Sequence, residues 1–115
     1  MAIREGQKVS EEELAAYRSG RMALRRQLES LMGQARIDLW VCPAAPGPAP
    51  EGITTTGNPL MNLPWTHAGL PTLSLPAGHA ENRLPLGLQC VGAFMADEQL
   101  LAWAVGLAEI LASLP

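Results

Sequence analysis

The chain has 115 residues, of which 48% are apolar and 17% charged, with a mean hydropathy of +0.09 and a formal net charge of −3. This composition is typical of one globular domain, long enough to bury roughly two-thirds of its unfolded surface around a single core. The slight acidity argues against nucleic acid or an anionic membrane as a partner, and no uninterrupted apolar run is long enough to predict a transmembrane helix. The polar N-terminal residues have no signal-peptide pattern, so we expect a cytoplasmic protein.

Charged side chains are concentrated near the N-terminus. Residues 1–36 carry twelve of the nineteen, and residues 37–115 carry the other seven. A typical soluble domain has about a quarter of charged residues. The charge-poor part therefore has few side chains with which to face solvent, and we expect some of it to be covered by other protein.

The N-terminal third is organised around one long helix. Residues 1–9 form a polar lead-in, which we expect to lack regular structure, and residues 10–115 form a single domain. Ser10 and Glu13 have the spacing of a capping box, in which each side chain pairs with a free amide at a helix start. Apolar residues then recur at steps of three and four, which predicts a helix from Glu11 to about Ala35. Gly20 indicates a kink or a break midway.

Four arginines lie on the polar face of this predicted helix: Arg18, Arg21, Arg25 and Arg26. An anion-binding site is one interpretation of such a cluster. A solvated face with ion pairs to nearby glutamates is the more ordinary one, and it is the interpretation that we favour.

Three short apolar segments predict strands. Residues 37–42 end at Pro43, as a buried strand entered from a helix would. Residues 72–75 and 86–92 flank a short turn, so they suit an antiparallel pair. The proline-rich residues 43–64 exclude a long regular element, and we expect an ordered excursion along a sheet edge with a helical turn near residues 58–63.

A closing helix begins near Asp97 and Glu98, where negative charge favours a helix start. It is apolar on nearly every side, which indicates burial on more than one face. The predicted fold is therefore α/β: a small mixed sheet of about three strands with a long N-terminal helix and a C-terminal helix.

Side chains that could perform catalysis are few. None of the serines stands in a glycine-rich turn that would expose it beside oxyanion donors, and Lys8 is the one lysine. His67 and His79 lie in predicted turns, where either could act as a base. A thiol dyad with Cys90 is conceivable, although a cysteine in an apolar strand is more typical of a packed core.

The two cysteines and two histidines also lack the close spacing of metal ligands. We expect Cys42 and Cys90 to be buried and reduced rather than bridged. No phosphate-binding loop or dinucleotide fingerprint is present. The sequence therefore predicts no catalytic residue, no metal site and no cofactor within this chain.

Four motifs together resemble the C-terminal end of amidase-signature enzymes. They follow one another in the family's order and spacing, and the resemblance covers about residues 10–113: DLWVCP at 38–43, GLPTLSLPAG at 69–78, LPLGLQCVG at 84–92 and DEQLL at 97–101. Members of that family hydrolyse amide or related C–N bonds with a Ser–Ser–Lys triad, which belongs to the preceding and larger part of such enzymes. Lys8 has no surrounding match to the family's lysine motif.

The resemblance implies that this chain supplies sheet strands, the closing helix and part of the substrate-pocket wall of an α/β/α sandwich. By position, Trp65, Thr66 and His67 are the expected wall residues, although a turn that packs Trp65 on the sheet explains them equally well.

The leading hypothesis is a C-terminal fragment or truncated form of an amidase-family hydrolase, inactive alone, whose partner is a missing catalytic segment. The alternative is a free-standing, non-catalytic interaction module that forms a homo-oligomer or binds a partner through its apolar, charge-poor surface. A Cys/His enzyme is the third hypothesis, for which a reactive Cys90 thiol is the minimum requirement.

Overall fold

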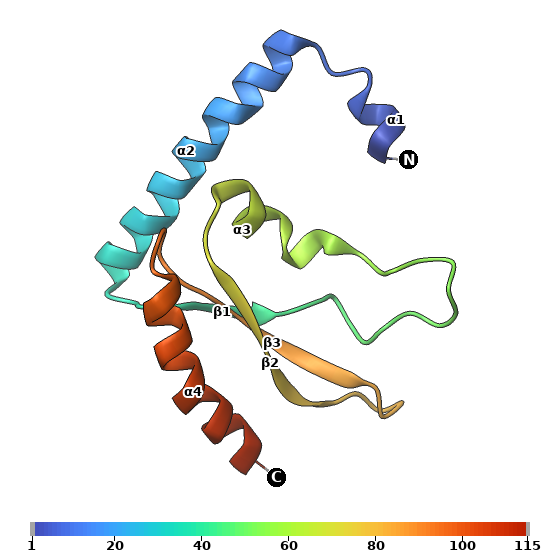
Figure 1. Cartoon of the computed structure of the whole chain (residues 1–115), viewed down its shortest axis with the longest axis vertical. Helices are drawn as coiled ribbons and strands as arrows, with labels where there is room; N and C mark the ends of the chain where they lie inside the picture. Colours follow the sequence, from blue (N-terminus) through green and yellow to red (C-terminus); the bar gives the residue numbers. More distant parts are fainter. Residues whose placement is uncertain (1, 115) are drawn as a thin grey trace.

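The computed structural model describes residues 2–114, in which helices lie on both sides of a small sheet (Figure 1). Residues 1 and 115, at the outer ends of the expected lead-in and domain, lie outside this range. In chain order the elements are α1 (Ala2–Gly6), α2 (Glu11–Ala35), β1 (Trp40–Pro43), the 3-10 helix η1 (Pro59–Met61), α3 (Leu63–Ala68), β2 (Thr72–His79), β3 (Pro85–Val91) and α4 (Asp97–Ser113).

The long helix α2 begins and ends as its sequence predicts. The Ser10 Oγ accepts a hydrogen bond from the Glu13 amide at 3.1 Å, and Glu13 Oε2 accepts one from the Ser10 amide at 2.9 Å. This reciprocal pair is the predicted capping box. The helix continues through Gly20 without the break that this glycine suggested, and it stops where Arg36 adopts a left-handed conformation, φ 54°.

The N-terminal lead-in contains a short helix, α1, where we expected no regular structure. Alanine, arginine and glutamate are good helix formers, and their local preference is enough for about one turn. An exposed ion pair of 3.0 Å joins Glu5 Oε1 in this helix to Lys8 Nζ just beyond it.

The sheet has the strand order β1-β3-β2, and both pairings are antiparallel. The predicted number of strands is confirmed, but the sheet is not mixed. β1 and β2 run in the same direction, yet β3 lies between them, so no parallel pair forms. β2 also extends four residues beyond the predicted strand, through Pro76 to His79, which is tolerated because β2 is an edge strand and its register shifts at this point.

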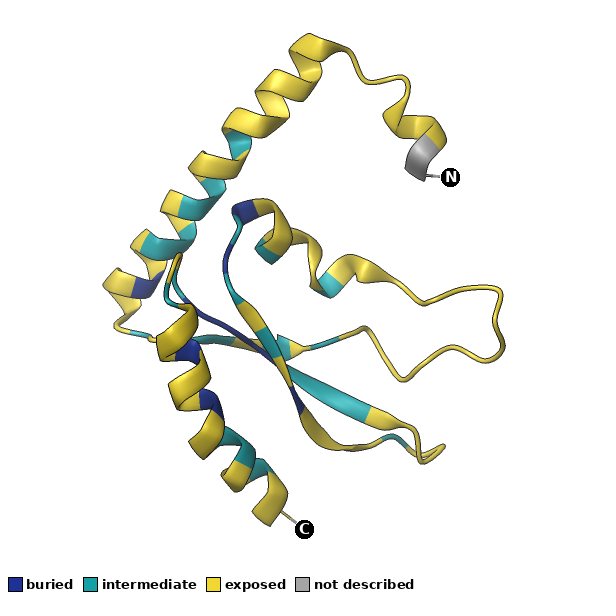
Figure 2. Ribbon diagram, in the orientation of Figure 1, coloured by how far each residue is buried: buried dark blue, intermediate teal, exposed yellow. Residues whose placement is uncertain are grey.

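Helices cover the two faces of the sheet. Cys90 and Val91 are successive residues of β3, both fully buried, and they point to opposite faces because side chains alternate along a strand. Cys90 packs with Leu100 and Ala104 of α4, whereas Val91 packs with Ala68 and with residues of α2 and α3. Figure 2 shows this buried path along β3, with exposed surface on the outer sides of α2 and α4. The arrangement is an α/β/α sandwich, as expected.

The proline-rich segment leaves the sheet after β1 and extends away from it as an exposed loop (Figure 1). The amide of Ala44 still donates to the Gly87 carbonyl at 2.9 Å, which continues the sheet edge by one residue. The predicted helical turn is present as η1, where Asn58 Oδ1 accepts a hydrogen bond from the Leu60 amide at 2.9 Å.

Candidate functional site

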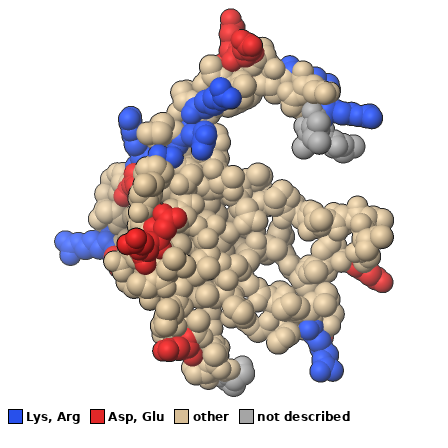
Figure 3. Space-filling model, viewed as in Figure 1, with Lys and Arg blue, Asp and Glu red and all other residues tan. Residues whose placement is uncertain are grey.

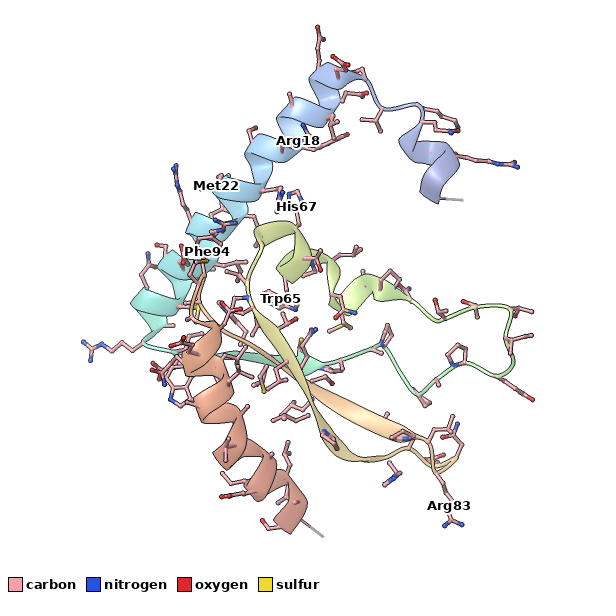
Figure 4. The ribbon with its side chains drawn as sticks, in the orientation of Figure 1. Arg18, Met22, Trp65, His67, Arg83 and Phe94 are labelled. Atoms are coloured by element: carbon pink, nitrogen blue, oxygen red, sulfur yellow. The ribbon has the colours of Figure 1, made fainter. Side chains whose placement is uncertain are left out.

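The three residues expected to form a pocket wall lie on α3, a short helix rather than a turn. A proline occupies the first turn of α3, where its missing amide hydrogen costs nothing, and Gly69 ends the helix with φ 71°. Trp65 is half-buried, while Thr66 and His67 are exposed. Figure 4 shows His67 at the end of α3 nearest to α2.

Trp65 anchors α3 to the sheet. Its indole ring stacks on that of Trp40 in β1, with centroids 6.4 Å apart and planes inclined by 27°. Stacked aromatic pairs of this kind contribute about 0.5–1.5 kcal/mol beyond the area that they bury. Both indole Nε1 atoms are buried and have no hydrogen-bond partner within residues 2–114. Trp65 is therefore a packing residue that holds α3 against the sheet.

Arg21 and Arg25 of α2 hold the C-terminal end of α3. Arg21 Nε donates to the His67 carbonyl at 3.0 Å, and Arg25 Nε donates to the Ala68 carbonyl at 2.7 Å. The guanidinium of Arg25 also lies over the ring of Phe94, 3.5 Å from its centroid. The last carbonyls of a helix lack intrahelical partners and carry partial negative charge, so cationic donors suit them.

This geometry corrects the interpretation of the arginine face. Two of its four arginines contact backbone carbonyls of another helix, and within the described residues the ion pair found is that between Lys8 and Glu5, not one of these arginines with a glutamate. Figure 3 shows positive side chains gathered along α2, whereas the sheet and its loops are almost free of charge on this side.

A partly buried pair of hydrogen bonds, centred on Gln89, fixes the loop that enters α3. Cys42 Sγ donates to Gln89 Oε1 at 3.2 Å, and Gln89 Nε2 donates to Asn62 Oδ1 at 2.6 Å. Gln89 is only 5% exposed, and a buried amide requires such partners. These two hydrogen bonds link β1 and β3 to Asn62, the residue that precedes α3. Since Arg21 and Arg25 hold the C-terminal end of this helix, α3 is held at both ends.

The structure does not assemble the conceivable thiol dyad. Cys90 is fully buried on the face covered by α4, whereas His67 and His79 are exposed, on α3 and at the end of β2. Burial, with a smaller contribution from Cys42, raises the pKa of the Cys90 thiol above its ordinary value. A thiol with a raised pKa is a poor nucleophile.

The two cysteines are free, as expected, although Cys42 is only half-buried. Val41 is directly opposite Cys90 in the sheet, so Cys42, its neighbour, points to the other face. In residues 2–114 no three His, Cys, Asp or Glu side chains come together as metal ligands would. No helix in this range is long and apolar enough to cross a bilayer.

An apolar hollow of about 640 Å³ lies elsewhere, between the segment that leaves β1 and the far end of the β2–β3 hairpin. None of its lining residues is charged, and none belongs to α3. The lining consists of Val41, Cys42, Pro43, Ala45, Pro46, Gly47, Pro48, Ala77, Ala80, Leu86, Gly87 and Leu88. Hence the expected wall residues and this cavity belong to different parts of the surface.

Five residues position α3, a role that was not predicted for them from the sequence: Arg21, Arg25, Trp40, Asn62 and Gln89. Gln89 carried a usable signal, since a glutamine inside an apolar strand must find a partner. No sequence signal indicates the contacts of Arg21 and Arg25, because they join residues more than forty positions apart in the chain.

Comparisons with known proteins identify the kind of domain to which this arrangement corresponds. The amidase family model matches residues 1–101. A glutamyl-tRNA(Gln) amidotransferase subunit from Trichormus variabilis is 42% identical over 72 residues, which are 56% of this chain and 15% of that protein. The same subunit from a Cyanothece species is 35% identical over 85 residues, 68% of this chain and 17% of that protein.

A crystal structure of an amidase is similar in fold as well as in sequence. It superposes with a TM-score of 0.75 and 30% identity over 99% of this chain, which corresponds to 28% of the amidase chain. The chain thus spans a small part of the proteins that it matches. These matches do not favour the alternative of a free-standing interaction module.

Proposed function

Because the chain belongs to the amidase family, we propose that it supplies the C-terminal structural part of an amidase-family hydrolase, which as a complete enzyme hydrolyses amide or related C–N bonds. One observation carries this proposal: nearly the whole chain superposes on little more than a quarter of an amidase. In this proposal the 115 residues are inactive alone, and the nucleophile and its activating groups come from a catalytic part outside them.

The geometry of the described residues supports this division of labour. The polar groups nearest α3, namely those of Gln89, Asn62, Arg21 and Arg25, are engaged in holding α3 against the sheet and α2. The Cys90 thiol is buried with a raised pKa. An arrangement of this kind positions backbone and surface, and it leaves bond cleavage to other residues.

The exposed side of α3 is the part of this proposal that concerns substrate. Thr66 and His67 would form part of the pocket wall in the complete enzyme, and Trp65 would fix their position through its stack on Trp40. The exposure of both side chains supports this role, as does the rigid attachment of α3 at each end.

The partner in this proposal is the catalytic part of an amidase-type chain. The relatives are named as one subunit of an amidotransferase, which supports contact with further polypeptides. Self-association of the isolated chain is a second expectation, since its apolar surface lacks a cover. We propose no contact of this segment with nucleic acid, and a cytoplasmic location is the expectation for the complete enzyme.

The activity of the purified chain tests the proposal. The chain is incubated with glutamine, an aliphatic amide and an aryl anilide, and product is measured against buffer, while circular dichroism reports whether it is folded. We expect no turnover above buffer. Hydrolysis by the folded chain that His67→Ala or another substitution within it abolishes would contradict the proposal.

A further inference from the structure

The two faces of the edge strand β1 are covered unequally. On one face, Trp40 stacks on Trp65 and Cys42 bonds to Gln89, beneath α3. Val41 points to the opposite face, since it is directly opposite Cys90, which α4 covers. Yet Val41 is 59% exposed. The helix that covers Cys90 therefore does not reach across to β1.

The position of α4 explains this gap. α4 packs on β2 and to a lesser extent on β3, so it lies over the side of the sheet away from β1. Its flank toward β1 carries Trp103 and Ile110, which border a hollow of about 350 Å³ together with Leu39 and Leu107. Ile110 is 60% exposed. An apolar wall thus stands beside an apolar floor, and no residue that the structure describes covers Val41 in that floor.

We name this surface the β1 ledge. Its floor and wall are made of six residues: Leu39, Val41, Pro43, Leu88, Trp103 and Ile110. Pro43 is directly opposite Leu88, so both lie on the same face as Val41. Since Val41, Pro43 and Leu88 also line the hollow of about 640 Å³, the ledge and that hollow form one apolar surface.

The dimensions of the ledge suit one helix. Neighbouring strands are about 4.8 Å apart, so β1 is about 10 Å from β2, with β3 between them. Packed helices have their axes about 8–10 Å apart. A helix placed beside α4 would therefore lie over β1 and cover Val41. On the other flank of α4, Leu101 and Val105 are also exposed, but β2 is the edge strand, so no strand forms a floor there.

The charges around the ledge define its occupant further. The ledge residues are uncharged, and two acidic residues border them: Asp38 lines the 350 Å³ hollow, and Glu109 precedes Ile110 on α4. Lysine or arginine at the rim of an incoming helix would complement them. A helix with one apolar stripe and basic residues at its border fits both the shape and the charge.

We propose that the β1 ledge binds one amphipathic, basic-rimmed α-helix from the catalytic part of an amidase-type chain. This inference rests on the proposed function, because an amidase that superposes on nearly the whole of this chain has most of its own residues outside the superposed part. The ledge is the place where that part adds a second helix beside α4 and completes the helical layer on this face of the sheet.

A chimera tests the ledge directly. The superposed part of the crystallised amidase is replaced by residues 1–115, and single cysteines are introduced as Ile110→Cys or, as the matched control, Val105→Cys. Both positions are on α4, and their side chains are 60% and 63% exposed. Iodoacetamide labelling is followed residue by residue with mass spectrometry, which separates the introduced thiols from Cys42 and Cys90.

In the isolated chain at low concentration, we expect both introduced thiols to react at similar rates. In the chimera, Ile110→Cys should react at least tenfold more slowly, and Val105→Cys should change less than twofold. Equal rates at both positions in an active chimera would overturn the ledge and leave the proposed function intact. Protection of Ile110→Cys that grows with the concentration of the isolated chain and is absent from an active chimera would assign the ledge to a second copy instead and overturn the proposal.

The chimera's hydrolysis of the amidase's own amide substrate separates the two claims. A chimera that does not fold, or that folds without hydrolysis, counts against the proposed function. The ledge proposal then fails as well, because its occupant is the catalytic part of such an enzyme. Hydrolysis together with selective protection of Ile110→Cys supports both.

Discussion

The indole rings of Trp40 and Trp65 stack 6.4 Å apart and join β1 to α3. This contact links two segments that the proline-rich loop separates in sequence. Around it, Gln89 holds the beginning of α3, and Arg21 and Arg25 hold its end. The most thoroughly fixed short element of the chain is thus the one that carries the expected pocket-wall residues.

Replacing Trp65 should destabilise the fold through the loss of this stack. We expect Trp65→Ala to lower the free energy of unfolding by about 3 kcal/mol, the lower end for a buried aromatic ring because Trp65 is only half-buried. Trp65→Phe should lose less than half as much. Urea denaturation followed by circular dichroism measures both. Trp103→Ala is the control, since Trp103 borders the ledge and should matter little in the isolated chain; an equal loss there would contradict the account.

The side chain of Arg25 should stabilise α3 more than the side chain of Arg26, the next residue on α2, does. Arg25→Met removes the 2.7 Å bond to the Ala68 carbonyl and the contact with Phe94, and should cost about 1–3 kcal/mol. Arg26→Met changes the net charge equally at an exposed position and should cost less than about 0.5 kcal/mol. Thermal unfolding measures stability, and amide exchange at residues 68–70 reports on α3. Faster exchange with both variants would refute the capping role.

Substitutions in the hydrogen-bonded series Cys42–Gln89–Asn62 should change the free energy of unfolding in a strongly non-additive way. Asn62→Leu leaves the buried Gln89 Nε2 without its partner and should cost about 1–3 kcal/mol. Gln89→Leu removes the central amide and leaves the Cys42 thiol, a weak donor, without its acceptor. The double variant should therefore be less destabilised than the sum of the two single variants, because it leaves no amide of the Gln89–Asn62 pair without its partner, while the Cys42 thiol lacks its acceptor in Gln89→Leu and in the double variant alike. Additive losses in a double-mutant cycle would contradict a coupled chain.

The Cys90 thiol should make stability fall at alkaline pH. Burial raises its pKa in the folded chain, with a smaller contribution from Cys42, so the folded state keeps its proton at a pH where the unfolded state loses it. The contribution is complete below the ordinary cysteine value of about 8.5 and is lost as pH rises from there through the folded value. Urea denaturation from pH 7 to 10.5 should show this decline, and Cys90→Ala should flatten it. A decline of the same slope in Cys90→Ala would assign it to other groups.

Local sequence signals were sufficient for most elements of this fold. The Ser10–Glu13 spacing predicts the start of α2, and the apolar period predicts its full length, because both depend on contacts within one helix. The antiparallel β2–β3 pair follows from the shortness of its turn. The strand order does not follow, since nothing local determines that β3 lies between β1 and β2.

Less of the candidate site than of the fold could be predicted from the sequence. Trp65, Thr66 and His67 were expected in a turn, but they form a helix because Pro64 suits the first turn and Gly69 can end it. The attachments of α3 come from Arg21, Arg25, Gln89 and Trp40, each of which is far from its partner in the chain. Such pairings depend on the tertiary fold, and no periodicity or spacing in a single sequence predicts them.

The central claim is that this chain completes an amidase whose chemistry lies outside it. The most direct test is the rate of amide hydrolysis by the chimera in which residues 1–115 replace the superposed part of the crystallised amidase, measured beside the isolated chain. The account predicts hydrolysis by the chimera and none by the isolated chain. Hydrolysis by the isolated chain, abolished by a substitution within it, or a folded chimera without activity, would contradict it.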